Sequence, residues 1–236
     1  KEYVSYFVGC LLGRYPLDTP GLVLANQGDT IQAYLNKIPS PTFMPDENNV
    51  VPILDDIWFH DDIVHRFYEF IKVCFGEKEV NTNVQYIEQV LGKSMRQYFI
   101  KDFYKDHVST YQKRPIYWLF SSDKGSFQAL IYMHRYTKDT PSIVLRYLRD
   151  YILKLNEKIA SLQRKEVDAT LSTTEQNKAR KEIDKLEKVL KELHSYEKEI
   201  LYPLATQRIE IDLDDGVKHN YPLLGKSLKK VPGLSE

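Results

Sequence analysis

The sequence predicts an α+β protein that is mainly α-helical, and three patterns point to this fold class. Apolar residues recur at spacings of three and four over much of the chain, which is the period of an amphipathic helix. Two aromatic-rich segments, 115–122 and 126–136, instead alternate with a period of two and frame a Ser-Asp-Lys-Gly turn, which predicts a central β-hairpin. Two long, charged segments after residue 140 keep a helical stripe, which predicts a long antiparallel helical hairpin arm.

The first half of the chain is expected to contain four helices. The first runs from Glu2 to Leu12 and is ended by Gly13 and two nearby prolines. The segment 61–76 repeats apolar residues every three or four positions after an acidic start, and the segments 81–92 and 94–112 follow with the same period. Before the second helix, the stretch "VVPILDD" fits either a short strand or an extended entry segment.

The second half of the chain begins with the arm. Thr140 and Pro141 are expected to open its first helix, as the cap and the first-turn residue. The sequence Ser-Thr-Thr-Glu at 172–175 is a capping box for the second helix, so the tip is expected near residues 168–173. Beyond the arm, the segment 208–221 alternates around an Asp-Asp-Gly turn and predicts a small C-terminal β-hairpin.

These elements divide the chain into three parts. Residues 1–140 are expected to form a mixed globular part with helices and the central β-hairpin, and residues 141–202 the arm. Residues 203–236 are expected to form a C-terminal β-hairpin and a tail that packs back on the core. A chain of 236 residues buries a sizeable core without covalent staples, and two cysteines are too few for a disulfide framework or a cysteine zinc site.

Composition restricts the class of protein and its location. The net charge is zero, which gives no global signal for nucleic acid or a membrane, and no apolar run approaches the roughly 18 residues of a membrane span. We therefore expect a cytoplasmic protein with no membrane partner. The chain starts at Lys1 with apolar and aromatic residues close behind it, unlike a signal peptide, which predicts a fragment of a longer protein.

Charge is unevenly distributed along the chain. From Lys93 to Arg149, eleven Lys and Arg residues meet only four acids, whereas from Pro45 to His65 six acids meet no Lys or Arg. The acidic run is either a solvated helix N-terminus, the favoured interpretation, or a site for a basic partner. The basic run interleaves cations with Tyr, Phe and Trp, which is typical of a nucleic-acid-binding face.

Six residues of the basic run are candidates for contact with DNA. Four cations either contact phosphates or only keep the surface soluble: Lys113, Arg114, Arg135 and Lys138. Two aromatic residues of the first predicted strand, Tyr117 and Trp118, either contact bases or pack in the core. Packing is the favoured interpretation for most of the aromatic residues, because one face of a strand is normally buried.

No catalytic or cofactor-binding pattern is present in the sequence. The chain contains no G-x-G-x-x-G, no P-loop, no Asn-Pro-Pro-aromatic run and no Glu-x-Lys or Asp-x-Lys triplet. His60, Asp61 and His65 are close in sequence, but their spacing fits no standard metal site, and solvated charges at a helix start are the favoured explanation. We therefore expect no catalytic residue, no metal and no cofactor in this chain.

Long stretches of the sequence resemble the C-terminal region of the PglX family, adenine-specific DNA methyltransferases of BREX phage-defence systems. The resemblance rests on five stretches in the family's order: "SYFVGCLLGRYPLDTPGL", "ILDDIWFHDDIVHRFYEFIKVCFG", "YFIKDFYKDHVSTYQKRPIYWLFSS", "GSFQALIYMHRYTKDT" and "LYPLATQRIEIDLDDGVKHNYPLLG". It covers nearly the whole chain, although the arm matches only in its heptad-like character.

The resemblance implies a place for the chain within a larger enzyme. In that family the S-adenosylmethionine site and the Asn-Pro-Pro-Tyr motif belong to a catalytic domain N-terminal to this region, and the whole protein methylates adenine N6 in a short asymmetric DNA site. The C-terminal half is expected to read the target and to hold the duplex around a flipped base. The implied partners are double-stranded DNA, the N-terminal methyltransferase domain and other BREX components. The motif "GRY" implies that Arg14 is a structural or DNA-contacting residue.

Two other functions remain as alternatives. In the first alternative, the chain is a protein-interaction module that docks the catalytic domain or other defence components without contacting DNA. An exposed apolar stripe on the arm would favour that alternative. The second, an independent enzyme, is the least favoured, because no motif with catalytic geometry is present.

Overall fold

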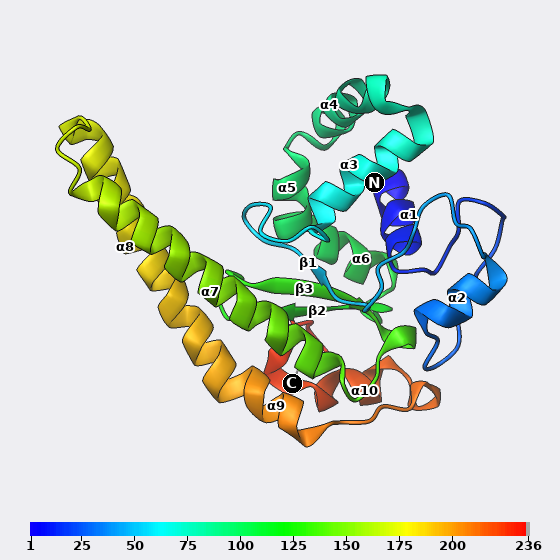
Figure 1. The fold of residues 1–236 in the computed structure, drawn as a ribbon. Coiled ribbons are helices and arrows are strands. Elements are labelled where there is room, and N and C mark those ends of the chain that lie inside the picture. Colours follow the sequence, from blue (N-terminus) through cyan, green and yellow to red (C-terminus); the bar gives the residue numbers. More distant parts are fainter. Residues whose placement is uncertain (235–236) are drawn as a thin grey trace.

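A three-stranded antiparallel sheet lies at the centre of the protein. The computed structural model describes residues 1–234 and orders the strands β1 (Val51–Pro52), β3 (Gln128–Tyr132) and β2 (Tyr117–Ser121), with β3 in the middle. In the β2–β3 hairpin, Leu119 lies opposite Leu130. The predicted central β-hairpin is therefore confirmed, and "VVPILDD" supplies a short third strand (Figure 1).

Helices from the first half of the chain cover one face of this sheet (Figure 1). They are α1 (Glu2–Leu11), α3 (Ile63–Phe75), α5 (Met95–Tyr98) and α6 (Tyr104–Thr110), and α4 (Val80–Leu91) packs on α3 away from the sheet. A short helix, α2 (Ile31–Lys37), lies on the outer side of the molecule. Aromatic rings join these helices, since Phe7 of α1 contacts Phe67 of α3 with 5.1 Å between ring centroids.

Local sequence explains where these helices begin. The Asp62 carboxylate accepts a hydrogen bond from Val64 N (2.9 Å) and caps α3, and the Ser94 hydroxyl accepts one from Gln97 N (3.3 Å) and caps α5. The predicted helices of the first half are present. The segment 94–112 is not one regular α-helix, however, because a π-turn interrupts it between α5 and α6.

The opposite face of the sheet packs on the base of the arm. Its helices α7 (Thr140–Glu166) and α8 (Thr173–Tyr196) run antiparallel, and their outer half projects away from the rest of the molecule (Figure 1). Ser172 starts α8 with the predicted capping box, because its hydroxyl accepts from Glu175 N and the Glu175 carboxylate accepts from Ser172 N (2.9 Å). The predicted helical hairpin arm and the mainly helical α+β class are therefore confirmed.

The start of the arm differs from the prediction by one residue. Asp139, not Thr140, occupies the cap position of α7, and Thr140 is the first helical residue. The Thr140 hydroxyl instead accepts a hydrogen bond from Thr137 N (3.0 Å), which fixes the turn that enters the helix.

No helix of residues 1–234 combines the length and the apolarity needed to cross a membrane.

The predicted C-terminal β-hairpin over residues 208–221 is wrong. After α9 (Tyr202–Gln207), the chain forms a 3₁₀ turn and then α10 (Val217–Leu223). The side chain of Asn220 explains the difference: its amide nitrogen donates to Asp212 O and its amide oxygen accepts from Asp212 N (3.2 Å). Both backbone groups that Asp212 would offer to a partner strand are therefore occupied by one side chain.

The C-terminal segment still reaches the sheet. Leu228 forms an antiparallel bridge with Phe120, and Lys229 N donates to Leu119 O (2.7 Å). The segment thereby pairs with the free edge of β2 at one point. One hydrophobic cluster joins residues of all three predicted parts of the chain, including Phe7, Leu148 and Leu228, so the division into parts stays a prediction.

Candidate functional site

The turn after α6 presents Lys113 and Arg114 at the surface. Gln112 and Lys113 both have a positive φ (49° and 62°), a backbone conformation that is uncommon outside glycine. Two hydrogen bonds of 2.8 Å hold the turn, from Lys113 N to Val108 O and from Arg114 N to Tyr111 O. Neither cation forms an ion pair with a carboxylate of residues 1–234, so both charges are available to a partner.

Arg135, in contrast, is buried and serves the fold. Its guanidinium donates to Leu12 O (3.3 Å) and to Glu47 O (3.0 Å), and only 5% of the residue is exposed. Burial raises the pKa of nearby Asp46 to about 6, and the charge of Arg135 opposes this rise. Burial also lowers the pKa of Arg135, which Asp46 opposes. A guanidinium enclosed in this way offers no surface to a phosphate, so Arg135 does not fit the predicted contact.

Lys138 is exposed but already has a partner. Its ammonium lies 3.1 Å from a carboxylate oxygen of Glu210, and both side chains are largely solvated. An exposed pair of this kind contributes only roughly 0–1 kcal/mol, so it does not prevent Lys138 from meeting a phosphate. It does make Lys138 a weaker candidate than Lys113 and Arg114, whose charges have no such competitor.

The two candidate aromatic residues of β2 pack in the core. Tyr117 stacks on His107 of α6 (4.6 Å between ring centroids), and Trp118 meets the ring of Tyr221 in α10 edge to face (5.5 Å). Both are almost completely buried, and the indole N–H of Trp118 donates to Pro115 O (3.0 Å). Both faces of the hairpin are therefore covered by protein, which corresponds to the packing interpretation.

Arg14 occupies a distinct position beside α6. It lines a cavity of about 330 Å³ together with residues of α1, α6 and β2. Its Nη1 donates to the Tyr111 hydroxyl (2.5 Å), and its guanidinium lies 5.0 Å from the centre of the Tyr15 ring. His107, in the same cavity wall, accepts a hydrogen bond from Tyr117 N (3.1 Å), and burial together with the charge of Arg14 lowers its pKa to about 3. His107 is therefore neutral near pH 7.

The sequence patterns did not reveal three further cations, in the C-terminal segment. Lys226, Lys229 and Lys230 line a groove of about 520 Å³ beside Ser122. None of the three forms an ion pair with a carboxylate of the described chain. The charge pattern of the sequence does not distinguish these three lysines from the other lysines of the chain. Only the attachment of the C-terminal segment to β2, a contact between distant parts of the chain, brings them to this surface.

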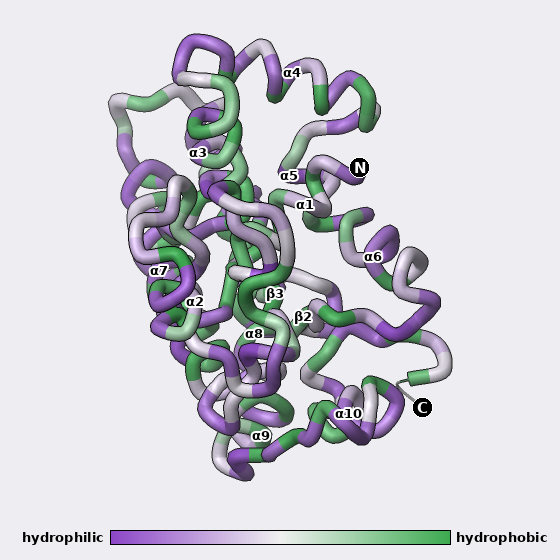
Figure 2. Tube along the Cα trace, turned by 90° about the vertical axis from the view of Figure 1, so that its right-hand side faces the viewer, coloured by the Kyte–Doolittle hydropathy of each residue, from purple (hydrophilic) through white to green (hydrophobic). Residues whose placement is uncertain are grey.

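These lysines lie on the same side of the molecule as the α6 turn. The C-terminal segment runs antiparallel to β2 from Leu228, so Lys229 and Lys230 follow the strand toward its first residue, Tyr117, three residues after Arg114. Lys226 lies toward the last residue of the strand, beside Ser122. Figure 2 shows α6 and the C-terminal end along one side of the chain. We call the following five residues the basic edge: Lys113, Arg114, Lys226, Lys229 and Lys230.

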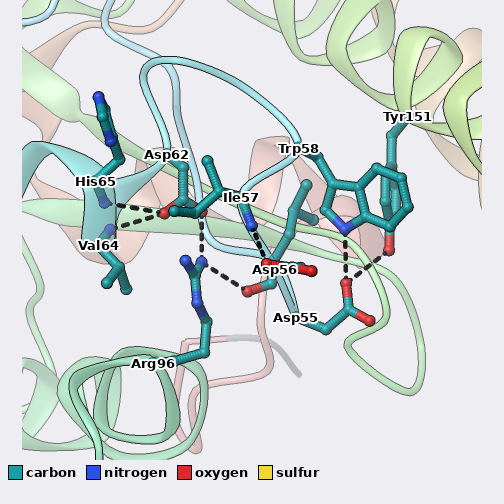
Figure 3. A network of polar contacts seen from close by, with 10 residues as sticks. Asp55, Asp56, Ile57, Trp58, Asp62, Val64, His65, Arg96 and Tyr151 are labelled. Carbon is teal, nitrogen blue, oxygen red and sulfur yellow. Dashed lines mark hydrogen bonds and ion pairs between the residues drawn. The ribbon is translucent and has the colours of Figure 1, made fainter.

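Half of the acidic run lies inside the protein: Asp46, Asp61 and Asp62 are buried, and the other three acids are exposed. Figure 3 shows the contacts of Asp55, Asp56 and Asp62. Asp62 is fully buried at the start of α3, and its carboxylate lies 2.5 Å from Nη1 of Arg96. Arg96 also donates to Leu54 O (3.0 Å), and Asp55 accepts from the Trp58 indole N–H (2.8 Å). The expected solvated helix start is therefore wrong for Asp62, because its buried carboxylate caps α3 and pairs with the half-buried Arg96.

Neither a metal centre nor a catalytic cluster emerges from this part of the chain. Among residues 1–234, no group of three or more His, Cys, Asp or Glu side chains converges as a metal site would require. His65 lies 3.5 Å from Glu69 on the exposed side of α3, while the Asp61 carboxylate accepts from the Tyr147 hydroxyl. The two residues thus face different surroundings despite their proximity in sequence.

Comparison with known proteins identifies two relatives. No protein-family model matches the chain. The chain is 38% identical over 233 residues to the adenine-specific methyltransferase PglX of Lacticaseibacillus casei (strain Zhang), a match that covers 94% of this chain. It is 38% identical over 253 residues to the adenine-specific methyltransferase BrxX of Escherichia coli O9:H4 (strain HS), a match that covers all of this chain. The predicted resemblance to PglX is confirmed.

The chain corresponds to only part of such a methyltransferase. It spans 19% of the PglX protein and 21% of the BrxX protein, so it is about a fifth of the length of these relatives. The match is consistent with the C-terminal region of PglX. The activity carried by the names of the two relatives therefore belongs to proteins with much additional sequence.

Proposed function

We propose that the chain is a non-catalytic, DNA-engaging part of a site-specific adenine-N6 DNA methyltransferase that acts in bacterial phage defence. The similarity to PglX and BrxX supports the methyltransferase context. The basic edge supports contact with DNA, because its five cations lie on one side of the molecule without a carboxylate partner among residues 1–234. This unpaired cluster is the observation that carries the proposal.

The basic edge contacts the phosphate backbone of double-stranded DNA. Each phosphate that a cation neutralises releases counterions, which gives a slope of about −0.9 in log K against log salt concentration. Five such contacts give a slope of about −4.5, so the affinity falls about 500-fold between 50 and 200 mM salt. Phosphate contacts position a protein on the duplex and carry no sequence information, so reading of the target requires contacts other than those of the basic edge.

The remaining functions of the methyltransferase belong to the rest of the enzyme. S-adenosylmethionine and the catalytic residues are supplied by its methyltransferase domain, which is a partner of this chain. Other BREX components are further partners, and the enzyme works in the cytoplasm, where the DNA is. The arm and the sheet act as a scaffold that holds the basic edge at a fixed place relative to the methyltransferase domain.

A second candidate function is the docking of another protein without contact to DNA. The arm itself gives it little support, because within the described chain the large apolar residues exposed on the arm are Leu153 and Val167, which do not form a stripe. The α3–α4 region gives it more, since Phe75, Tyr86 and Val90 are 48–66% exposed there. Exposed apolar side chains that gather on one surface are a feature of protein interaction sites.

The test is binding of the chain to a fluorescently labelled DNA duplex, measured by anisotropy over a series of KCl concentrations. The double variant Lys113→Gln/Arg114→Gln is expected to reduce the salt slope by about 1.8, because two phosphate contacts are lost. The matched control is Arg164→Gln/Lys165→Gln, which removes an adjacent Arg and Lys from the exposed arm tip.

The outcomes separate the two candidate functions. A control variant that binds like the unmodified chain, together with a reduced slope for the Lys113 and Arg114 variant, supports the basic edge. An equal loss in both variants shows that only total charge matters and contradicts the proposed surface. Absence of binding at 50 mM KCl contradicts DNA engagement by this chain and favours the docking function.

A further inference from the structure

The charge of Arg14 is not neutralised by any carboxylate of residues 1–234. The residue is half-buried, and no Asp or Glu of that part of the chain forms an ion pair with it. Burial lowers the pKa of its guanidinium, but the hydrogen bonds of Tyr111 and Tyr117 raise it, and the net direction is upward. Arg14 therefore stays charged. Burial lowers the pKa of both His107 and His134, and the charge of Arg14 lowers it further.

Aromatic side chains hold this guanidinium in place. The ring of Tyr15 lies 5.0 Å from it and the ring of Tyr111 lies 5.9 Å away, while the Tyr111 hydroxyl accepts from Nη1 (2.5 Å). The fold leaves room for this arrangement at Gly9, where a Cβ would lie 2.4 Å from Cδ2 of Tyr15. Arg14 has five N–H donors, so several remain to bind a ligand in the cavity.

Arg14 is partly shielded from water and has no carboxylate partner among residues 1–234, so its charge attracts an anion that enters the cavity. The cavity of about 330 Å³ lies at the small end of the range of ligand pockets, so it admits a single group and not a whole duplex. An arginine fork recognises the oxygens of a phosphate by paired hydrogen bonds. Tyr111, which lines the cavity, lies only two residues before Lys113. The cavity therefore adjoins the turn that starts the basic edge.

We infer that the Arg14 cavity binds one phosphate group, which Arg14 holds with the help of the Tyr111 hydroxyl. This inference rests on the proposed function for the source of the group, a phosphodiester of the DNA that the basic edge holds. A free phosphate monoester offers the same chemistry. Arg14 is the binding residue, and Tyr111 is a positioning residue that acts through it.

Two carboxylates also line the cavity and oppose an anion. Asp106 is already compensated, since Nζ of Lys1 lies 2.8 Å from its carboxylate and the Tyr98 hydroxyl donates to it (2.9 Å). Glu2 is exposed and has no ion-pair partner among the described residues. The variant Glu2→Gln is therefore expected to strengthen phosphate binding, a gain that a purely structural role of the cavity does not produce.

The test uses two probes on the same set of proteins: inorganic phosphate and a labelled DNA duplex. Inorganic phosphate at ten times its dissociation constant, compared with chloride at equal ionic strength, is expected to raise the melting temperature by about 3–6 °C. Arg14→Gln is expected to abolish this rise and to weaken duplex binding roughly tenfold or more. Tyr111→Phe keeps the ring and is expected to weaken both effects in part.

Arg164→Gln on the arm is the control, and it should behave like the unmodified chain with both probes. If Arg14→Gln fails to fold, the Glu2→Gln variant provides the test. Phosphate raises its melting temperature more than that of the unmodified chain if the cavity binds phosphate, and by the same amount if it does not. A phosphate effect that needs Arg14, with duplex binding that does not, supports the phosphate site but assigns it to a free monoester. If phosphate raises the melting temperature of all variants equally, the cavity holds an adventitious ion only, and this result overturns the inference.

The two proposals fail in distinguishable ways. If Lys113→Gln/Arg114→Gln weakens duplex binding while Arg14→Gln changes neither readout, the cavity inference is wrong and the DNA-engaging function stands. If duplex binding is insensitive to both variants, DNA engagement through this surface is wrong. The melting-temperature series then still decides whether the cavity binds phosphate.

Discussion

Replacing Arg135 by Met distinguishes a structural arginine from a DNA contact. Arg135 lies in the basic run of the sequence, but its guanidinium bonds to Leu12 O and Glu47 O inside the protein. Each hydrogen bond from a charged donor contributes about 1.5–3 kcal/mol, and Arg135 makes two of them. The variant is therefore expected to lose about 4 kcal/mol of unfolding free energy at pH 7.5, which lowers the melting temperature by about 8–16 °C.

The pH dependence of the loss follows from Asp46. Its folded-state pKa of about 6 is higher than the ordinary value of 3.8, because burial raises it more than Arg135 lowers it. A carboxyl with a raised folded-state pKa stabilises the fold fully below pH 4 and loses that stability, here about 3 kcal/mol, as the pH rises through 6. Without Arg135 the pKa of Asp46 rises further, so the variant is expected to lose less at pH 4 than at pH 7.5.

The assay is urea denaturation followed by circular dichroism at both pH values, with duplex binding measured in parallel. Other titrating groups cancel in the difference between the variant and the unmodified chain. The reasoning is refuted if Arg135→Met costs less than about 1 kcal/mol at pH 7.5, well under the range for two lost hydrogen bonds from a charged donor. It is also refuted if a fully folded variant loses as much DNA affinity as Lys113→Gln/Arg114→Gln.

Three further substitutions test the packing and the caps. Gly9→Ala is expected to destabilise by about 2 kcal/mol in thermal melts, because the clash with Tyr15 outweighs the helix propensity of Ala; an unchanged melting temperature would contradict this. Arg96→Met leaves the buried Asp62 carboxylate unpaired and should cost about 3–5 kcal/mol in urea, and Asp62→Asn added to it should recover part of that loss. Ser172→Ala removes the capping box of α8 and should cost about 1 kcal/mol, with faster hydrogen exchange confined to the arm tip.

Local patterns predicted the elements of the fold wherever one segment contained its own start and stop signals. Ser172 caps its helix as predicted, Asp62 lies at the start predicted from its acidic residues, and the Ser-Asp-Lys-Gly turn joins two strands. The segment 208–221 failed because its alternation competes with a side-chain contact. Asn220 binds the backbone of Asp212 eight residues away, and no pattern of hydrophobic residues reports such a bond.

The surface could be predicted only in part, because charge in a sequence does not show burial. Lys113 and Arg114 are exposed as expected, whereas Arg135 has the same charge and is enclosed by carbonyls 123 and 88 residues away. Lys229 joins the basic edge only through the bond of its N–H to Leu119 O. The Arg14 cavity likewise needs three segments that the fold alone brings together.

The lysines beside β2 have a competing explanation that does not involve DNA. An edge strand with unpaired backbone groups is a site of aggregation, and lysines placed along an edge are a common protection against it. The single bridge between Leu228 and Phe120 pairs only one point of the β2 edge with the C-terminal segment, so the lysines of that segment lie where such protection acts. The two explanations differ in one respect, the sign of the charge that each requires.

Reversal of that charge separates them. Glutamate protects an edge from other strands about as lysine does, but it repels phosphates. For the variant Lys229→Glu/Lys230→Glu, DNA contact therefore predicts a loss of duplex affinity larger than that of the neutral Lys229→Gln/Lys230→Gln variant, while both stay monomeric in sedimentation. Edge protection alone predicts unchanged duplex affinity in both variants, with aggregation in the neutral one. Because the two measurements are independent, a protein in which the lysines serve both purposes would show both losses, each in its own assay.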